Sequence, residues 1–188
     1  MDPLLKDAIQ SLSWLVASIG GVVAAFKAIA EFRETRLWRR TELAKNIVDE
    51  IWADKKCRDA MVMVDWDNRE FTLDSEEKVR INRIEVGPAL RTDVQKLTFS
   101  KKEVFIRDCF DSLLDALQRL EHYIGTGLIS FEDVEYPLDY TVVELCFIRA
   151  EINGYVVAYD FHNAARFLGR YDVWKRLDRV GRKPCIEQ

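Results

Sequence analysis

The sequence predicts an all-α protein in which a long N-terminal transmembrane helix continues into a helical bundle. Three observations favour this class. The segment from Ala8 to Phe26 carries no charge and is mostly apolar. Further along, apolar residues recur at the spacing of helices, and helix-start signals precede several of these runs. The chain has 188 residues, 48% hydrophobic and 32% charged, so the part beyond the anchor is long enough for one domain with its own core.

The apolar segment has nearly the length that a membrane span requires. A spanning helix needs about 20 mostly apolar residues to cross roughly 30 Å of hydrocarbon. The stretch from Ala8 to Phe26 approaches that length, and Ile29 and Phe32 can extend it. We therefore expect residues 1–32 to form a transmembrane anchor.

Two alternatives compete with the anchor. The first is a cleaved signal peptide with Ala28-Ile29-Ala30 as its cleavage site, although Lys27 precedes that site and the basic N-terminal region is weak. The second is a buried or oligomer-forming helix of a soluble protein, because alanine, glycine and serine make the segment only moderately hydrophobic.

The charges that flank this segment are unequal. The short N-terminal side holds Lys6 against Asp2 and Asp7, whereas the C-terminal side is rich in lysine and arginine. Because these residues accumulate on the cytoplasmic side of membranes, we expect the N-terminus outside and the bulk of the chain in the cytoplasm. The expected contacts to anionic lipid are Arg33, Arg36, Arg39 and Arg40.

Small residues recur every four positions along the anchor, at Ser13, Ala17, Gly21 and Ala25. A helix places them on one stripe. Lipid supplies no hydrophobic drive between helices, so close approach through small residues favours association. The stripe predicts a homo-oligomer, and the alternative is that such residues are simply common in spanning helices.

The first half of the chain starts with a helix signal, Asp2 before Pro3. We expect one helix from about Pro3 to Trp52, or two helices broken near Phe32, with residues 33–56 as a basic juxtamembrane helix. Asp54 is the expected cap of a second helix. Residues 65–71 look like a loop. The apolar residues of 72–97 follow neither the helical nor the strand period. This segment is therefore predicted to be irregular or a short strand pair, with an interruption at Gly87-Pro88.

The second half contains the clearest helix. Ser100 and Glu103 form a capping box before an apolar face that continues to Ile124, so we expect a helix over about 101–124. A short helix should follow Ser130. Pro137 fits the first turn of a further helix, which we expect to end at 153–154. The last predicted helix covers 155–168. The cytoplasmic domain is thus expected over 57–180, with a polar tail at 181–188.

No catalytic or cofactor-binding motif stands out. The net charge of −4 gives no global argument for nucleic acid. The widely spaced cysteines suit reduced thiols better than a disulfide framework or a zinc site; they are Cys57, Cys109, Cys146 and Cys185. Two separate histidines, His122 and His162, do not make a metal site. We therefore expect no metal, no cofactor and no nucleic-acid partner.

Several stretches resemble a group of uncharacterised bacterial proteins with one N-terminal membrane helix and a cytoplasmic helical domain of unknown function. The stretches are RRTELAKNIVDEIW, FDSLLDALQRLEHYIGTGLI, and the segment from Phe131 to Arg149. The resemblance covers most of the chain, but its motifs are helix faces and not catalytic signatures. It implies attachment to a bacterial inner membrane and a helical fold, and it transfers no active site.

These observations favour a non-enzymatic, membrane-anchored module that self-assembles or binds a protein partner at the inner membrane. A stress or phage-defence effector is one concrete version of that role. The alternative is a ligand sensor with a pocket between cytoplasmic helices, lined by Tyr155, Tyr159, Phe161 and His162. An enzyme is the third class, and nothing in the sequence names its reaction.

Overall fold

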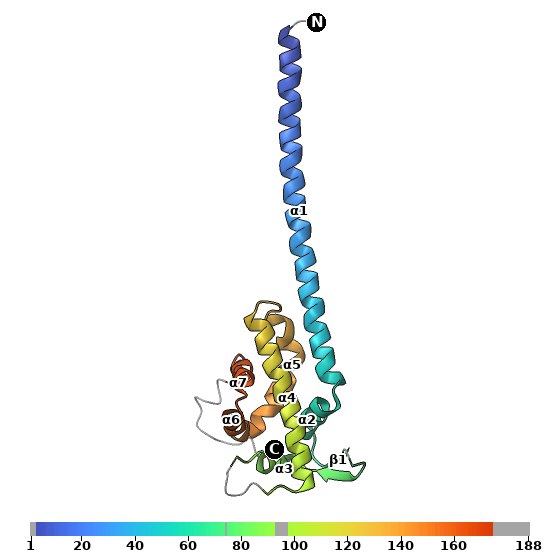
Figure 1. The fold of residues 1–188 in the computed structure, drawn as a ribbon, viewed down its shortest axis with the longest axis vertical. Coiled ribbons are helices and arrows are strands. Elements are labelled where there is room, and N and C mark those ends of the chain that lie inside the picture. The colour runs from blue at the N-terminus through green and yellow to red at the C-terminus, as the bar shows by residue number, and fades with distance from the viewer. Residues whose placement is uncertain (1–2, 74, 93–97, 175–188) are drawn as a thin grey trace. The chain divides into compact units, whose positions relative to one another are not determined.

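The computed structural model describes residues 3–73, 75–92 and 98–174, and the side chains of the first helix at 21, 22 and from 24 onward. The chain divides into two units, Met1–Glu42 and Leu43–Gln188. The first helix, α1 (Pro3–Ala53), is unbroken, as Figure 1 shows, which confirms one long helix in place of two. No proline or glycine follows Gly21 within it, so nothing in the sequence ends the helix near Phe32.

The described part of the first unit exposes large apolar side chains. Phe26 and Phe32 are 70% and 68% exposed, and Val22 and Ile29 are also exposed. Within the described residues, no helix is both long enough and apolar enough to cross a membrane. Most of the segment from Ala8 to Phe26 lies outside the residues whose side chains the structure describes.

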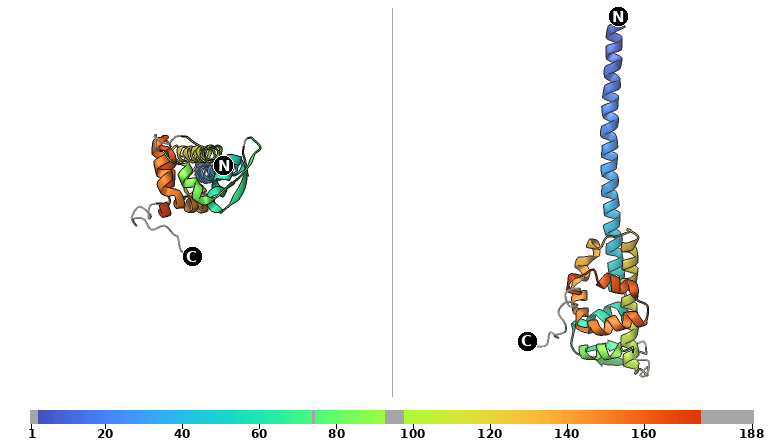
Figure 2. Two further views of the ribbon diagram at one scale, coloured as in Figure 1. Left: turned by 90° about the horizontal axis from the view of Figure 1, so that it is seen from below. Right: turned by 90° about the vertical axis from the view of Figure 1, so that its left-hand side faces the viewer.

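The second unit is built around one long helix. α4 (Lys101–Gly125) packs against α2 (Lys55–Asp65) and α7 (His162–Leu168), as Figures 1 and 2 show. The predicted capping box is present, because Ser100 accepts a hydrogen bond from the Glu103 backbone and the Glu103 carboxylate accepts one from the Ser100 backbone. The prediction of this helix from its apolar face and capping box is thus confirmed.

The least regular segment contains a hairpin and a short helix. Strands β1 (Arg69–Thr72) and β2 (Lys78–Ile81) pair antiparallel, with Phe71 opposite Val79. Of the two alternatives for this segment, an irregular stretch or a short strand pair, the strand pair forms. β1 begins inside residues 65–71, which the sequence predicts to be a loop. The expected interruption at Gly87-Pro88 is wrong, because both residues belong to α3 (Arg83–Ala89).

A capping box explains why α3 forms. Asn82 accepts from the Ile84 backbone at 3.0 Å, and Glu85 accepts from the Asn82 backbone at 2.8 Å. These contacts satisfy N–H groups that a helix start leaves without partners. Pro88 lies in the last turn, so its missing N–H removes few helical hydrogen bonds.

The C-terminal helices differ from the predicted boundaries. α5 (Glu132–Leu145) is a single helix with Pro137 inside it, and not two helices that meet there. Val134 and Leu138 are both buried, so the turns on either side of Pro137 are anchored in the core. The short η2 (Cys146–Ile148) and α6 (Arg149–Ala158) follow, so the expected end at 153–154 is also wrong.

The predicted helix over residues 155–168 is interrupted. α6 ends before Tyr159, and α7 begins at His162. Between them Asp160 has a φ of 61°, in the left-handed region that a right-handed helix cannot contain. The Phe161 backbone N–H returns to the Val156 carbonyl at 3.0 Å and closes this turn. Gly169 follows α7, which ends at residue 168, where the sequence places the end of the last helix.

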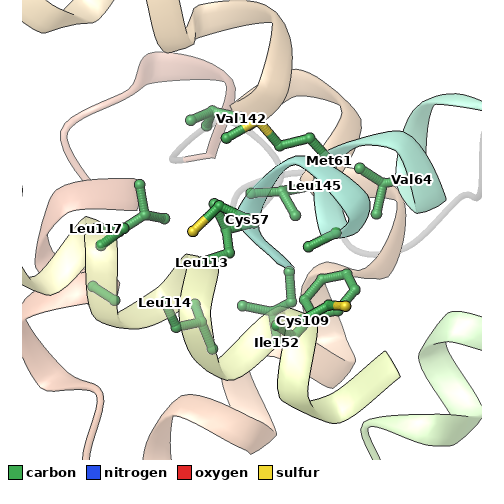
Figure 3. Close-up of a cluster of buried hydrophobic side chains, with 14 of the residues drawn as sticks. Cys57, Met61, Val64, Cys109, Leu113, Leu114, Leu117, Val142, Leu145 and Ile152 are labelled. Carbon is green, nitrogen blue, oxygen red and sulfur yellow. The ribbon is translucent and has the colours of Figure 1, made fainter. Parts of the chain in front are cut away.

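The core of the second unit joins four helices (Figure 3). The drawn side chains converge from α2, α4, α5 and α6 onto one apolar cluster. Its labelled members are Cys57, Met61, Val64, Cys109, Leu113, Leu114, Leu117, Val142, Leu145 and Ile152. The last turns of α1 also bury Ala44, Ile47, Val48 and Ile51. One shared core therefore fixes where α4 presents its polar side chains.

Candidate functional site

An arginine lies on the largely apolar face of α4. Arg107 is buried, and it shares that face with Phe110 and Leu114 at helical spacing. Its Nη1 donates to the carbonyl oxygens of Ala89 and Arg91, at 3.1 and 3.0 Å. A buried cation is tolerated only where its donors find acceptors, and these two carbonyls supply them at the end of α3.

Aromatic rings surround the same guanidinium group. Its Nη2 donates to the Tyr159 hydroxyl at 2.6 Å. The guanidinium carbon lies 4.2 Å from the Phe99 ring centroid, 4.8 Å from that of Tyr155 and 5.2 Å from that of Tyr159. The negative faces of aromatic rings attract a cation at such distances. Phe99, Tyr155 and Tyr159 with Arg107 therefore form one cluster, which we call the Arg107 cluster.

Tyr155 connects the Arg107 cluster to a carboxylate. Its hydroxyl donates to Asp111 at 2.6 Å, and its ring lies 4.6 Å from that of Tyr159 and 6.3 Å from that of Phe161. Burial first, and then the hydrogen bond to Asp111, raise the pKa of Tyr155 above its ordinary value. The phenol therefore stays protonated and remains a donor at neutral pH.

A shallow depression of about 490 Å³ lies beside the Arg107 cluster. Its lining combines two aromatic rings with polar side chains of α4: Asp111, Ser112, Asp115, Tyr159 and Phe161. Rings next to carboxylates suit a cationic or planar group, which can contact a ring face and an oxygen together. The depression is therefore a candidate ligand site of the second unit.

The structure brings together three of the four residues expected to line a ligand pocket. The ring of Tyr155 lies in contact with those of Tyr159 and Phe161. Tyr155 itself is buried and does not line the depression. His162 lies apart from them: its side chain is exposed, and its Nε2 lies 3.1 Å from Asp160. It is the first residue of α7 and follows the break at Asp160.

Sequence reasoning missed Arg107, Asp111 and Phe99. A signal for Arg107 was present, because it occupies an apolar-face position of the surest predicted helix, four residues before Asp111. An ionisable group on such a face points to a buried polar contact. Phe99 precedes the helix, and nothing in the sequence shows that it lies over an arginine.

The predicted membrane-facing residues are described only in part. Ser13 and Ala17 of the small-residue stripe lie outside the described side chains, whereas Gly21 and Ala25 are exposed. A side chain built at Gly21 would meet nothing within 4 Å in the chain. The arginines expected at anionic lipid are exposed at 33, 36 and 39, and half-buried at Arg40.

Comparisons with models of protein families, with curated proteins and with solved structures found no match.

Proposed function

We propose that this chain is a non-enzymatic helical module that is anchored in the bacterial inner membrane and self-assembles there. The observation that carries the proposal is the exposed apolar face of α1. Val22, Phe26, Ile29 and Phe32 follow one another at spacings of four, three and three residues, and all four are exposed. Such spacing puts them on one side of the helix.

An apolar face of this kind is unfavourable in water. Burying apolar surface stabilises by about 25 cal/mol per Å², and contiguous exposed apolar surface marks contact with a membrane or another protein. Arginines at 33, 36 and 39 follow directly and are exposed. An apolar face that gives way to a basic one is the pattern of a helix that leaves a membrane on its cytoplasmic side.

Assembly follows from the residues beside that face. Gly21 has open space where a side chain would stand, and the exposed Ala25 lies one turn further along. Within a membrane, small residues let two helix backbones approach closely. We propose that identical chains meet along the stripe of Ser13, Ala17, Gly21 and Ala25. A membrane-perturbing stress or phage-defence effector is the version of this role that we favour.

The test is the mass of the full chain in detergent, measured by mass photometry. We expect an oligomer for the wild type and its dissociation in Gly21→Ile, with membrane insertion retained. Because nothing in the chain fills the space at Gly21, a loss of mass reports a contact between chains. Ala30→Ile, on the opposite side of the helix, is the matched control. A monomeric wild type would refute self-assembly.

A second function is favoured by the depression beside the Arg107 cluster. In this version the second unit senses a small cation that contacts Tyr159, Phe161 and the carboxylates of α4. Thermal unfolding with tetramethylammonium or arginine methyl ester as probes tests it. A rise in Tm that Tyr159→Ala abolishes supports the sensor, and no rise with either probe speaks against it.

A further inference from the structure

The outer face of α5 carries an exposed aromatic stripe. Tyr136, Tyr140, Val143 and Phe147 follow one another at spacings of four, three and four residues, through α5 and into η2. Tyr136 is 91% exposed and Tyr140 is 58% exposed, and Val143 and Phe147 are exposed as well. Aromatic side chains grouped in this way are typical of protein interfaces, where their rings supply most of the contact area.

The charge of α5 has one sign. Its sequence, EDVEYPLDYTVVEL, contains acidic residues and no lysine, arginine or histidine. Glu132, Glu135 and Asp139 are exposed beside the stripe. A stripe of rings bordered by carboxylates favours a partner that carries arginine, whose planar cation stacks on rings and donates to carboxylates at once.

The same surface already binds one arginine of its own chain. Arg83, at the start of α3, donates to Glu144 at 2.8 Å, and its guanidinium carbon lies 4.0 Å from the centroid of the Phe147 ring. One cation thus satisfies a carboxylate of α5 and a ring of the stripe together. Further along the helix, Tyr136, Asp139 and Tyr140 are exposed, and the Tyr140 hydroxyl donates to Asp65.

A face with the complementary chemistry occurs on α1. Arg36 and Arg39 are spaced by three residues, which places them on one side of the helix. Both are exposed. Two guanidinium groups about one turn apart suit the carboxylates of Glu135 and Asp139, which are also about one turn apart on α5.

We propose that the α5 stripe binds the Arg36–Arg39 face of α1 from a second copy of this chain. The inference rests on the self-assembly proposed above and names the surfaces that the assembled copies use. Each copy donates its α1 face to one neighbour and its α5 stripe to another, so the contact is head-to-tail. Anchoring in one membrane would raise the effective concentration of these surfaces and favour a contact of modest area.

A charge-swap experiment on the full chain in detergent tests the proposal. The acidic-α1 variant carries Arg36→Asp and Arg39→Asp, and the basic-α5 variant carries Glu135→Arg and Asp139→Arg. Each alone opposes like charges at every head-to-tail contact, so we expect mass photometry to show a shift toward the monomer. A single chain that carries all four substitutions pairs opposite charges at every contact, whatever the number of copies, and we expect it to restore the wild-type mass.

Control variants distinguish this contact from a general effect of charge reversal. Lys45→Asp reverses an exposed charge on the opposite side of α1, and it should leave the oligomer unchanged. All of the altered side chains are exposed, and circular dichroism should show wild-type helix content in each variant. A wild type that is monomeric would refute self-assembly itself, whereas an oligomer unchanged in both swap variants would refute only this contact.

The remaining outcomes each point to another occupant. If the chain with all four substitutions stays dissociated, these two faces do not meet between copies. If only the basic-α5 variant loses mass, the Arg36–Arg39 face of α1 is not the partner of α5. If the acidic-α1 variant loses binding to phosphatidylglycerol vesicles but keeps its oligomer, that α1 face binds lipid. Any of these results overturns the proposal.

Discussion

Arg107 of α4 donates a 2.6 Å hydrogen bond to the hydroxyl of Tyr159, at the end of α6. The same guanidinium group donates to the carbonyls of Ala89 and Arg91, so one side chain joins α4 to the end of α3 and to the end of α6. These contacts come from three separate helices of the second unit. The arginine therefore acts as a polar link within the core of that unit.

Replacing this link should be costly. Arg107→Met keeps much of the side-chain volume but leaves two carbonyl oxygens without donors, at about 1–3 kcal/mol for each unsatisfied buried group. We expect the free energy of unfolding of the second unit to fall by about 2–6 kcal/mol. Tyr159→Phe, which removes only one acceptor, should cost about 1 kcal/mol.

Urea unfolding followed by circular dichroism measures both effects, on a chain without residues 1–32 if that chain is soluble. An unchanged slope with a lower midpoint would indicate a pure loss of stability. A loss below about 1 kcal/mol for Arg107→Met would show that water satisfies the two carbonyls, and that the arginine is not a structural link.

The apolar face of α4 gives a second prediction. Leu113 and Leu117 are both buried in the core cluster. Truncating either to alanine leaves a cavity, and such changes typically cost about 2–5 kcal/mol. The same urea measurement applies. Effects under about half a kcal/mol at both positions would show that the neighbouring side chains collapse into the space or that this face is not packed.

Local signals explain why some helices were predictable. α4 was recognised from its capping box and from an apolar face that ends at a glycine, all within one stretch of sequence. α1 was recognised because no breaker interrupts it after Gly21. In these cases helix propensity, apolar periodicity and capping residues all favour the helix that the folded structure contains.

Long-range packing explains the failures. Pro137 reads as a helix start, but buried Val134 and Leu138 hold the helix on both sides of it. The break at Asp160 depends on a left-handed backbone conformation at a residue that is not glycine, so the sequence gives no signal for it. The Arg107 cluster unites residues from 99 to 159, and only the folded chain brings them together. His162, grouped with the tyrosines by its nearness in sequence, lies apart from them.

Acid should weaken the N-terminus of α4. The hydrogen bond from Arg91, with those from Ser100, lowers the pKa of Glu103 from 4.5 to about 2. Because the folded pKa lies below the unfolded one, the carboxylate stabilises the fold above pH 4.5, and this contribution is lost as the pH falls toward 2. The Glu103→Gln variant should therefore be less stable than the wild type at neutral pH. The difference in stability between the two proteins should become smaller in acid.

Thermal unfolding of both proteins from about pH 7 to about pH 2.5 checks this dependence. Comparing the variant with the wild type removes the contributions of other carboxyl groups, such as Glu85, whose pKa is also lowered. A stability difference that stays constant across the whole range would contradict a role for the Glu103 charge.

The buried thiols should be unreactive. Burial raises the pKa of Cys57 and of Cys109 to about 12, and that of Cys146 to about 11. Since the thiolate is the reactive form, we expect an aromatic disulfide reagent at about pH 8 to modify Cys57 and Cys109 only after unfolding in guanidinium. Peptide mass spectrometry identifies the modified sites. Rapid modification of Cys109 in the native chain would contradict its place in the core.

Membrane extraction tests the central proposal most directly. The full chain and a chain lacking residues 1–32 are expressed in bacteria, and their membranes are washed with high salt and then with alkaline carbonate. We predict that the full chain stays in the membrane pellet through both washes, while the shortened chain is released as a folded soluble domain. A full chain that is freely soluble without detergent would contradict the anchor and favour a buried helix over residues 8–26.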